Sequence, residues 1–213
     1  DVFIYDYDRN KIDLLTPNAD GNSFNPSISG NGDLVAFYSN AGNLVSEDAN
    51  GSDADIFVVD RVAGSTELLT PGGNSSSRDP SISANGLHVA FRSQASNLVS
   101  FDQNGTLEDI FVYDRSTGLT EIITQNADAS SRDPVISADG NHVAFRSNAS
   151  NLIASDPNGT ISDVFIHDRT SGFTTLITSN GDAGSRRPAI SANGQYVAFQ
   201  SRASNLSASD TNG

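Results

Sequence analysis

Short runs of β-branched and aromatic residues, separated by polar turns, follow one another along the whole chain. One stretch shows four such runs, at Asp55–Asp60, Thr66–Thr70, Pro80–Ser83 and His88–Ser93. Runs of this composition are typical of strands, and no window keeps the period of an amphipathic helix. Asn-Gly or Asp-Gly pairs such as Asn85-Gly86 stand before the last run and predict tight hairpins with positive φ at both central residues. The pattern predicts an all-β fold of four-stranded antiparallel meanders.

This pattern repeats with a fixed period of 54 residues. The segment Asp1-Val-Phe-Ile-Tyr-Asp6 returns in similar form at Asp55, Asp109 and Asp163. A period of this size marks a repeat architecture, in which each unit buries its faces against its neighbours. We therefore expect one domain over 1–213, with repeat units 1–54, 55–108, 109–162 and 163–213.

The run Ile56-Phe57-Val58-Val59 is apolar without alternation, so both faces of that strand need to be covered. Four-stranded meanders that stack on both sides predict a β-propeller, and a linear stack of β units is the alternative. A small residue in the middle of one strand of each unit suits close packing between sheets: Ala36, Ala90, Ala144 and Ala198.

The segment Ile82-Ser-Ala-Asn-Gly-Leu-His-Val-Ala-Phe-Arg-Ser93, followed by Asp109-Ile-Phe-Val-Tyr-Asp-Arg115, resembles the PD40 (WD40-like) repeat of TolB-like β-propellers. The Ser-x-Asp/Asn-Gly turn, the Val-Ala-Phe strand and the Phe-Val-x-Asp strand carry the resemblance, which covers essentially the whole chain. It implies that Pro80–Ser83 is the innermost strand of a blade, and that the protein makes protein–protein contacts through its faces. The chain departs from the family in its long connection over Gln94–Glu108.

The strand order that the resemblance implies makes the chain begin in the middle of a blade. Residues 1–16 supply two outer strands, and residues 188–202 supply two inner strands. Three full blades and two halves predict a velcro closure, in which the two ends complete one shared blade. Two alternatives are four units of a larger array and two chains that form one eight-bladed ring.

The long connection has the shared form Asp-x-Asn-Gly-x-x-x-Asp and is the strongest candidate site. Ca²⁺ prefers six to eight oxygen ligands from carboxylates, amides and backbone carbonyls, and this pattern supplies such oxygens. Asp53 and Glu108 add carboxylates in their own units. An Asx turn without metal is the alternative, because Asp, Asn and Gly are also common loop formers. The candidate ligands are Asp48, Asn50, Asp55, Asp102, Asn104, Asp109, Asp156, Asn158, Asp163, Asp210, Asn212 and Asp1.

Two further recurrences flank this loop. Asn-Leu pairs, of which Asn43-Leu44 is the first, are expected to anchor the loop by a buried Leu and an Asn bonded to backbone. Segments of the form Ser-Arg-Asp/Arg-Pro enter the innermost strands and should surround one mouth of the channel. Their arginines either bind a carboxylate or a sugar, or neutralise Asp79 and Asp133. These arginines are Arg78, Arg132, Arg186 and Arg187.

Composition narrows the classes of partner. A formal charge of −14 and a pI near 4.3 argue against nucleic acid and favour cations or cationic partners. Cysteine is absent, which excludes disulfides and thiolate metal sites. Methionine is also absent, so we expect a processed chain or a piece of a longer protein. No apolar run is long enough for a membrane span, so we expect no membrane insertion.

No catalytic constellation is visible. His88, His142 and His167 do not cluster in the pattern, and no Ser-His-Asp order occurs. We predict no catalytic residue, no enzyme activity, and no cofactor other than Ca²⁺. The expected function is an extracytoplasmic binding or assembly module with Ca²⁺-binding loops and a protein partner or self-association. The alternatives are a carbohydrate- or small-ligand-binding propeller and an accessory propeller of a hydrolase.

Overall fold

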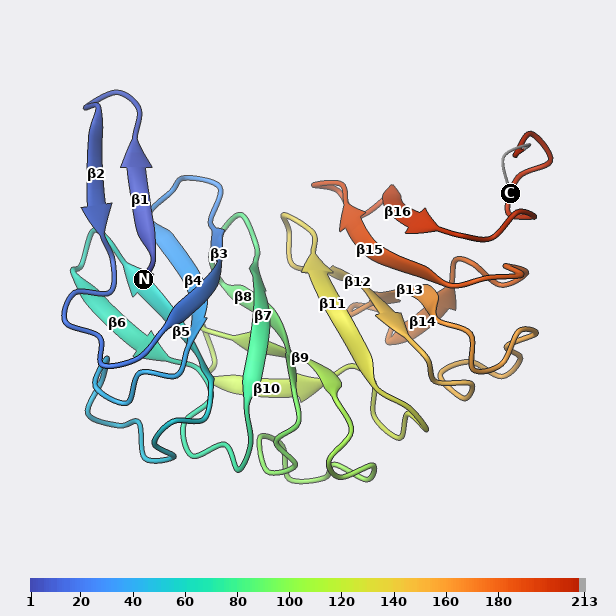
Figure 1. Cartoon of the computed structure of the whole chain (residues 1–213), viewed down its shortest axis with the longest axis horizontal. Helices are drawn as coiled ribbons and strands as arrows, with labels where there is room; N and C mark the ends of the chain where they lie inside the picture. The colour runs from blue at the N-terminus through green and yellow to red at the C-terminus, as the bar shows by residue number, and fades with distance from the viewer. Residues whose placement is uncertain (211–213) are drawn as a thin grey trace.

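The computed structural model describes residues 1–210, and all regular structure in that range is β. Three four-stranded antiparallel sheets follow one another, with a two-stranded sheet at each end. The sheets stand side by side as the blades of a β-propeller, arranged in an open arc (Figure 1). The predicted all-β propeller of four-stranded blades is confirmed. Among the described residues there is no helix long and apolar enough to cross a membrane.

Each full blade is a meander whose strands run in chain order from the first to the fourth. The N-terminal half blade has β1 (Phe3–Asp6) and β2 (Lys11–Leu14). The first full blade has β3 (Ser23–Ile28), β4 (Leu34–Ser39), β5 (Asp55–Asp60) and β6 (Ser65–Leu68). The second has β7 (Ser77–Ile82), β8 (His88–Ser93), β9 (Asp109–Asp114) and β10 (Leu119–Ile122). The third has β11 (Ser131–Ile136), β12 (His142–Ser147), β13 (Asp163–Asp168) and β14 (Phe173–Leu176). The C-terminal half blade has β15 (Ser185–Ile190) and β16 (Val197–Ser201).

The observed bounds agree with the predicted strands except in two places. The innermost strand β7 starts at Ser77 rather than Pro80, because its first residues pair with β8 before a register shift between Arg78 and Ser81. The shift is a β-bulge at which Asp79 takes a φ of 55°. The outer strand β6 ends at Leu68 rather than at Thr70. Thr70 contacts β5 through its side chain: its hydroxyl accepts from the Ile56 N–H and donates to Asp55.

The Asn-Gly hairpin turns form where expected but with a different geometry. Only the glycines have positive φ, for example 71° at Gly86, so positive φ at both central residues was a wrong expectation. The Gly86 N–H donates to the Ser83 carbonyl at 2.9 Å, and the Ser83 N–H donates to the His88 carbonyl at 2.9 Å. The turn between Ser83 and His88 is longer than a two-residue hairpin loop, so Asn85 does not need a positive φ. The Asn85 side-chain oxygen instead accepts hydrogen bonds from the Ser83 hydroxyl and the Leu87 N–H.

The core lies between the blades and is built mainly from the second and third strands, with single residues from the first and fourth, such as Ile136 and Leu176. β5 buries its first five residues on both faces, as its uninterrupted apolar run predicts. In each full blade a phenylalanine on the second strand stacks on one from the third, as Phe91 does on Phe111 at a ring distance of 5.7 Å. Ala90 between the blades is fully buried. This packing places the connection from second to third strand at one end of every blade.

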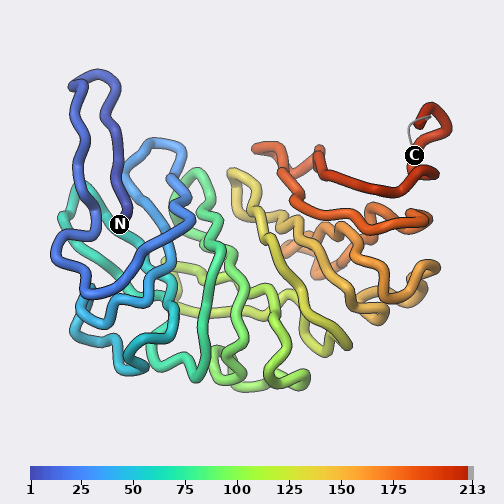
Figure 2. The backbone as a smooth tube through the Cα atoms, in the orientation of Figure 1, coloured from blue at the N-terminus to red at the C-terminus, as the bar shows by residue number. Residues whose placement is uncertain are grey.

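The two half blades lie at opposite ends of the arc (Figure 2). β1 pairs with β2 and β15 pairs with β16, and each pair forms a sheet of its own. The N-terminal half holds the two outer strands of a blade and the C-terminal half holds the two inner strands. The ends therefore carry the complementary halves that velcro closure of a propeller requires, separated by three complete blades.

Candidate cation sites in the acidic loops

The acidic loops connect the second strand of each full blade to the third. Each loop ends on the aspartate that opens the third strand, and this residue is at most 1% exposed: Asp55, Asp109 and Asp163. A carboxylate buried this deeply needs partners for both of its oxygens. The hydrogen bonds of these aspartates therefore show what the loops are built to hold.

A threonine from the fourth strand's end holds one oxygen of each buried aspartate. In the second blade the Thr124 hydroxyl donates to Asp109 Oδ1 at 2.6 Å and accepts from the Ile110 N–H at 3.0 Å. The same pair recurs as Thr70 with Asp55 and as Thr178 with Asp163. Sequence reasoning missed these threonines, although their own 54-residue spacing is a signal that could have found them.

The loop asparagine is fixed in one orientation by two acceptors. The Asn104 amide nitrogen donates to Asp109 Oδ1 at 3.1 Å and to the Ala127 carbonyl at 3.1 Å. Asn158 makes the equivalent bonds to Asp163 Oδ1 and the Gly181 carbonyl. Both partners only accept, so a flipped amide would place oxygen against oxygen. The amide oxygen must therefore point the other way, into the loop.

Several loop oxygens are buried without any hydrogen-bond donor. In all three loops these include the second oxygen of the buried aspartate and the amide oxygen of the asparagine. Carboxylate and amide oxygens cannot satisfy each other unless a proton or a cation lies between them. The complete set is Asp48 Oδ1 and Oδ2, Asn50 Oδ1, Asp55 Oδ2, Asn104 Oδ1, Asp109 Oδ2, Asp156 Oδ2, Asn158 Oδ1 and Asp163 Oδ2.

Burial changes the acidity of these aspartates. It raises the pKa of Asp55 and of Asp109 to about 6, against the hydrogen bonds from their threonine and asparagine partners. Burial also raises the pKa of Asp163. The first aspartate of each loop adds to the effect by repulsion, as Asp102 does on Asp109 and Asp156 on Asp163. The two carboxylates of a loop are thus close enough to interact, and a cation would relieve both.

The first aspartate differs between the three loops. Neither oxygen of Asp48 accepts a hydrogen bond of good geometry, although the backbone N–H groups of Asn50 and Gly51 lie near enough to oppose the rise in its pKa that burial, and then the charge of Asp20, causes. Asp102 Oδ1 accepts the backbone N–H of Asn104 at 3.2 Å and that of Gly105 at 3.3 Å. Asp156 Oδ1 accepts one such bond, from Asn158 at 3.2 Å. The first aspartate of each loop therefore faces backbone N–H groups of its own turn, with the best geometry in the second blade.

Amide and backbone oxygens have to contribute to any such site. Within residues 1–210, no three His, Cys, Asp or Glu side chains gather as a metal cluster. Glu108, an expected extra ligand, instead forms ion pairs with Arg92 and Arg132. Asp53 lies close enough to Asp55 that repulsion between the two carboxylates slightly raises the pKa of Asp55. A set of two carboxylates with amide and carbonyl oxygens suits Ca²⁺ better than Zn²⁺, which prefers nitrogen and sulfur.

The fourth predicted site is divided between the two ends of the chain. Asp1 accepts a 2.9 Å bond from Thr16, which accepts the Val2 N–H in turn, so the threonine arrangement is kept. Asp1 is exposed, unlike its three counterparts. Asp210 lies at the opposite end of the arc, and Asn212 falls outside the described residues. The described part of the chain therefore does not bring this set together.

The asparagines of the Asn-Leu pairs anchor the loops as expected, but the leucines are half-buried or exposed rather than buried. Asn97 donates to the Gly72 carbonyl at 2.8 Å and accepts the Asn74 N–H at 2.9 Å, which ties the acidic loop to the segment that enters the blade. Leu98 packs against the buried cluster between the blades. The same asparagine bonds recur at Asn43, Asn151 and Asn205.

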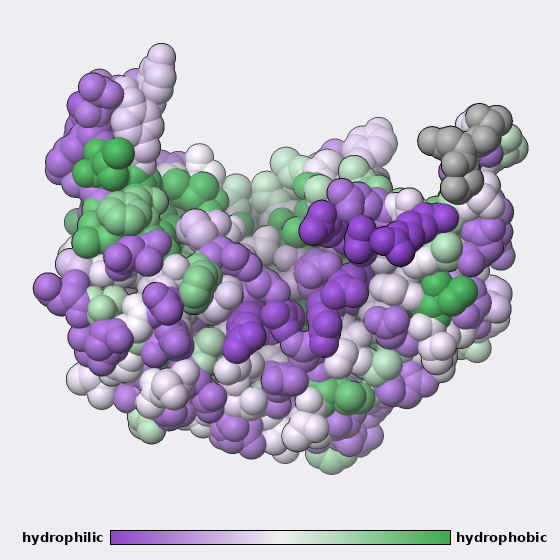
Figure 3. Space-filling view, viewed as in Figure 1, coloured by the Kyte–Doolittle hydropathy of each residue, from purple (hydrophilic) through white to green (hydrophobic). Residues whose placement is uncertain are grey.

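The channel-mouth arginines do not neutralise the aspartates beside them. Asp79 pairs with Arg92 at 2.5 Å and Asp133 with Arg146 at 2.7 Å, each from the neighbouring second strand. Arg132 pairs with Glu108. Three others are exposed and form no ion pair with a described residue: Arg78, Arg186 and Arg187. Figure 3 shows strongly hydrophilic side chains across the middle of the face that is turned toward the viewer.

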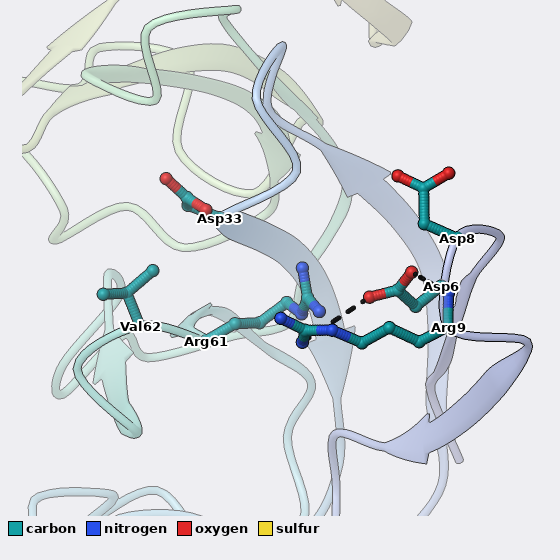
Figure 4. Close-up of a pocket in the computed structure, with 6 residues that line it drawn as sticks. All are labelled: Asp6, Asp8, Arg9, Asp33, Arg61 and Val62. Carbon is teal, nitrogen blue, oxygen red and sulfur yellow. Dashed lines mark hydrogen bonds and ion pairs between the residues drawn. The ribbon is translucent and has the colours of Figure 1, made fainter.

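A separate cleft beside the N-terminal hairpin is lined mostly by charged side chains. Asp6, Asp8, Arg9, Asp33, Arg61 and Val62 line its volume of about 360 Å³. Arg9 and Arg61 reach toward each other across the cleft, with Asp6 beside Arg9 (Figure 4). The lining combines three carboxylates with two guanidinium groups and one valine.

The fold and its repeated loops define a β-propeller, and the solved structures that it matches are propeller-containing proteins. TolB from Acinetobacter baumannii matches with a TM-score of 0.61 and 21% identity over 95% of this chain and 43% of that one. The predicted TolB-like fold is therefore confirmed. No family model and no curated protein matches the sequence.

Enzymes carry the same architecture. Dipeptidyl peptidase 4 from Porphyromonas gingivalis matches with a TM-score of 0.58 and 16% identity, over 92% of this chain and 32% of that one. Oligogalacturonate lyase from Vibrio parahaemolyticus matches with a TM-score of 0.56 and 14% identity, over 97% and 54%. The chain spans less than two thirds of each of these proteins. Identities this low establish the fold alone.

Proposed function

We propose that this propeller is a non-enzymatic, extracytoplasmic binding and assembly module whose acidic loops bind Ca²⁺. The donorless oxygens of the buried aspartate and asparagine, repeated in three loops, carry the metal part of the proposal. A turn that served only to shape the chain would satisfy its own oxygens, since an unsatisfied buried acceptor costs about 1–3 kcal/mol. Repetition of that cost in three loops favours a ligand.

Calcium fits these loops better than a proton does at neutral pH. A proton on Asp109 would remove its buried charge, but a pKa of about 6 leaves the group mostly ionised at pH 7. Ca²⁺ accepts the ionised carboxylate, the amide oxygen and backbone carbonyls at the same time. It would also offset two negative charges per loop in a chain of net charge −14.

The assembly part of the proposal rests on the architecture and the surface. The arc presents broad faces (Figure 1), and propellers commonly make protein–protein contacts through such faces. Extracellular modules bind Ca²⁺ with dissociation constants of about 0.1–1 mM, so an extracytoplasmic location would supply enough of the ion to fill such loops. The exposed arginines Arg78, Arg186 and Arg187 favour a second candidate function, the binding of an acidic ligand at the channel mouth.

Thermal unfolding tests the metal part of the proposal. We expect the midpoint at pH 7 to rise by several degrees between calcium-depleted buffer and millimolar Ca²⁺, because Ca²⁺ binds only the folded loops. The same concentration of Mg²⁺, which keeps its own waters and demands a tighter geometry, should raise the midpoint less. Equal midpoints in calcium-depleted and calcium-containing buffer would show that the loops are Asx turns without metal.

A further inference from the structure

We propose that the joint between the third blade and β15 binds the carboxylate of a glutamate or aspartate side chain from an acidic peptide, between Arg146 and Arg186. The inference rests on the second candidate function above, which it narrows to one joint and one kind of ligand, and it does not depend on calcium. Three equivalent joints carry it. The first lies between the first and second full blades, the second between the second and third, and the third between the third blade and β15.

The second joint holds a carboxylate of the protein itself between two arginines. Glu108 is 5% exposed and lies where the acidic loop meets β9. Its Oε1 accepts from Arg92 of the same blade, and its Oε2 accepts from Arg132 of the next blade. Two guanidinium groups from neighbouring blades thus form a clamp for one carboxylate.

The backbone places the corresponding residue of the third joint in the same position. The Ser131 N–H donates to the Glu108 carbonyl at 2.7 Å, and the Ser185 N–H donates to the Ser162 carbonyl at 2.7 Å. Ser162 stands one repeat after Glu108. The two side chains therefore leave the backbone at equivalent points of their joints.

The third joint keeps both arginines of the clamp. Arg146 stands one repeat after Arg92. Arg186 stands one repeat after Arg132. The Arg146 Nε donates to Asp133 at 2.7 Å, which fixes this guanidinium beside the joint. No other acid pairs with Arg146, and Arg186 pairs with none among residues 1–210.

The carboxylate is missing from the third joint, and the side chains around its position are smaller. Ser162 takes the place of Glu108, and its hydroxyl donates to the Ser185 carbonyl at 3.2 Å. Gly184 takes the place of Ser130. A Cβ on Gly184 would meet Ser162 at 3.6–3.7 Å, an ordinary contact, so the backbone does not require glycine there. Two shortened side chains leave room at this joint for a group from outside.

The local charge changes from balanced to positive between the two joints. The clamp arginines of the second joint face two acids, Glu108 and Asp79, and the charges cancel. At the third joint the two arginines face Asp133 alone. Arg187, which takes the place of the bulge aspartate one blade further on, is exposed and adds another positive charge. This excess attracts an anion although the net charge of the chain is −14.

The first joint shows that the arginine pair is not kept by the repeat alone. Ala54 takes the place of Glu108 there. Tyr38, which stacks on Phe24 at 5.2 Å, takes the place of Arg92. The first joint has thus lost the acid together with one arginine, whereas the third joint has lost the acid and kept both arginines.

The clamp of the third joint is open to solvent. The Arg132 side chain is 46% exposed although full blades flank it, and Arg186 is exposed at the equivalent position. Ser162 is half-buried. A side chain of a bound peptide can therefore reach the two guanidinium groups without moving the blades.

The second joint also shows which ligand fits the clamp. Glu108 presents its carboxylate on a side chain from a peptide backbone, and each oxygen meets a different blade. An acidic side chain of a partner protein can make the same two bonds at the third joint, which agrees with the assembly role proposed above. A glutamine side chain offers only one acceptor oxygen and fits less well.

Ser162→Glu tests the clamp without any ligand. We expect the new carboxylate to pair with Arg146 and Arg186 and to raise the midpoint of thermal unfolding by about 2–4 °C. Ala54→Glu is the matched control and should lower the midpoint, because the first joint lacks the second arginine. A Ser162→Glu midpoint that falls as far as that of Ala54→Glu would overturn the inference, since the arginines would then not be placed to receive a carboxylate.

Calorimetric titration at pH 7 and low ionic strength tests the ligand. The probe is a capped peptide of four glutamates, and the neutral probe is the same peptide with four glutamines. Calcium is removed on a chelating resin, because soluble chelators carry carboxylates of their own. We expect the glutamate peptide to bind the unmodified protein and to lose affinity by about tenfold or more in Ser162→Glu and in Arg186→Gln. Arg78→Gln, at the first joint, should bind as the unmodified protein does.

Three outcomes of this titration would overturn the inference. Equal binding of the glutamate and glutamine peptides, or no binding of either, would show that the joint does not hold a carboxylate. Binding that falls in Arg78→Gln and not in Arg186→Gln would move the acidic ligand to another part of the channel mouth and leave the second candidate function standing. Tighter binding of a uronic acid oligomer, lost in the same variants, would overturn the peptide as the partner. Calcium is absent throughout, so none of these results bears on the proposed metal sites.

Discussion

Two kinds of turn in the repeat, the hairpin turn and the acidic loop, have similar Asp, Asn and Gly residues but differ in how their aspartate oxygens are hydrogen-bonded. At the hairpin turn of the third blade, Asp139 Oδ1 accepts from the Ser137 hydroxyl and from the Asn141 N–H, and Oδ2 accepts from the Asn141 amide. At the acidic loop of the second blade, Asp109 Oδ1 accepts two bonds and Oδ2 accepts none. Both carboxylate oxygens of Asp139 in the hairpin turn thus have a donor, whereas one oxygen of Asp109 in the acidic loop has none.

The pKa values of the two aspartates differ in the way that these hydrogen bonds predict. Hydrogen bonds, first from Ser137, hold the pKa of Asp139 below its usual value. Burial raises the pKa of Asp109 to about 6. An Asx-Gly sequence is therefore compatible with a structural turn or with an ion site, and the supply of donors distinguishes the two.

The largest expected effect is a fall in stability with rising pH in calcium-depleted buffer. Asp55 and Asp109 bind protons more tightly when folded than unfolded, so stability is lost as pH rises from about 4 to about 7. A pKa raised from 3.8 to about 6 corresponds to about 3 kcal/mol for each carboxyl. Asp139 and Asp168, whose pKa values are lowered, act in the opposite sense below pH 4.

Urea unfolding at pH 4.5 and pH 7 measures this effect, with and without millimolar Ca²⁺. Calcium should abolish most of the fall, because it binds the ionised carboxylates and competes with protons. A stability that rises between these two pH values in calcium-depleted buffer would mean that the buried aspartates are satisfied as anions by the protein itself.

A smaller effect is expected from Asp109→Asn. The new amide keeps an oxygen that accepts from Thr124 and replaces the donorless Oδ2 with an NH₂ group, so it removes a buried charge. In calcium-depleted buffer at pH 7 we expect a gain of about 1–3 kcal/mol in the free energy of unfolding. In saturating Ca²⁺ the variant should lose one site's share of the stabilisation. A destabilised variant in both buffers would contradict the comparison.

Asp139→Asn is the matched control and has the smallest expected effect. Asn31, Asn85 and Asn193 occupy this position in the other hairpin turns and accept the same pair of bonds. The substitution should change stability by about 0.5 kcal/mol or less and leave the calcium response unaltered. A calcium response that disappeared in this variant would place the cation at the wrong turn.

The repeat made the fold predictable, because strand composition, glycine turns and a 54-residue period all point to the same architecture. The candidate loops were visible as well, since their polar residues recur at fixed spacing. The hydrogen-bond and ion-pair partners of individual polar atoms could not be predicted from the sequence. Glu108 pairs with Arg92 and Arg132 from two blades, and Thr124 reaches Asp109 across one sheet, so both contacts depend on register and bulges that sequence patterns leave open.

The most direct test of the central claim is equilibrium binding of Ca²⁺ to the purified chain at pH 7, followed by calorimetric titration or radiolabelled calcium. The structure predicts saturable binding with three sites per chain among the described loops, and a triple Asp55→Asn, Asp109→Asn, Asp163→Asn variant that folds and loses them. The absence of saturable binding up to about 10 mM Ca²⁺, which exceeds the dissociation constants of the weakest extracellular modules, would contradict the claim. Undiminished binding by the triple variant would contradict it as well.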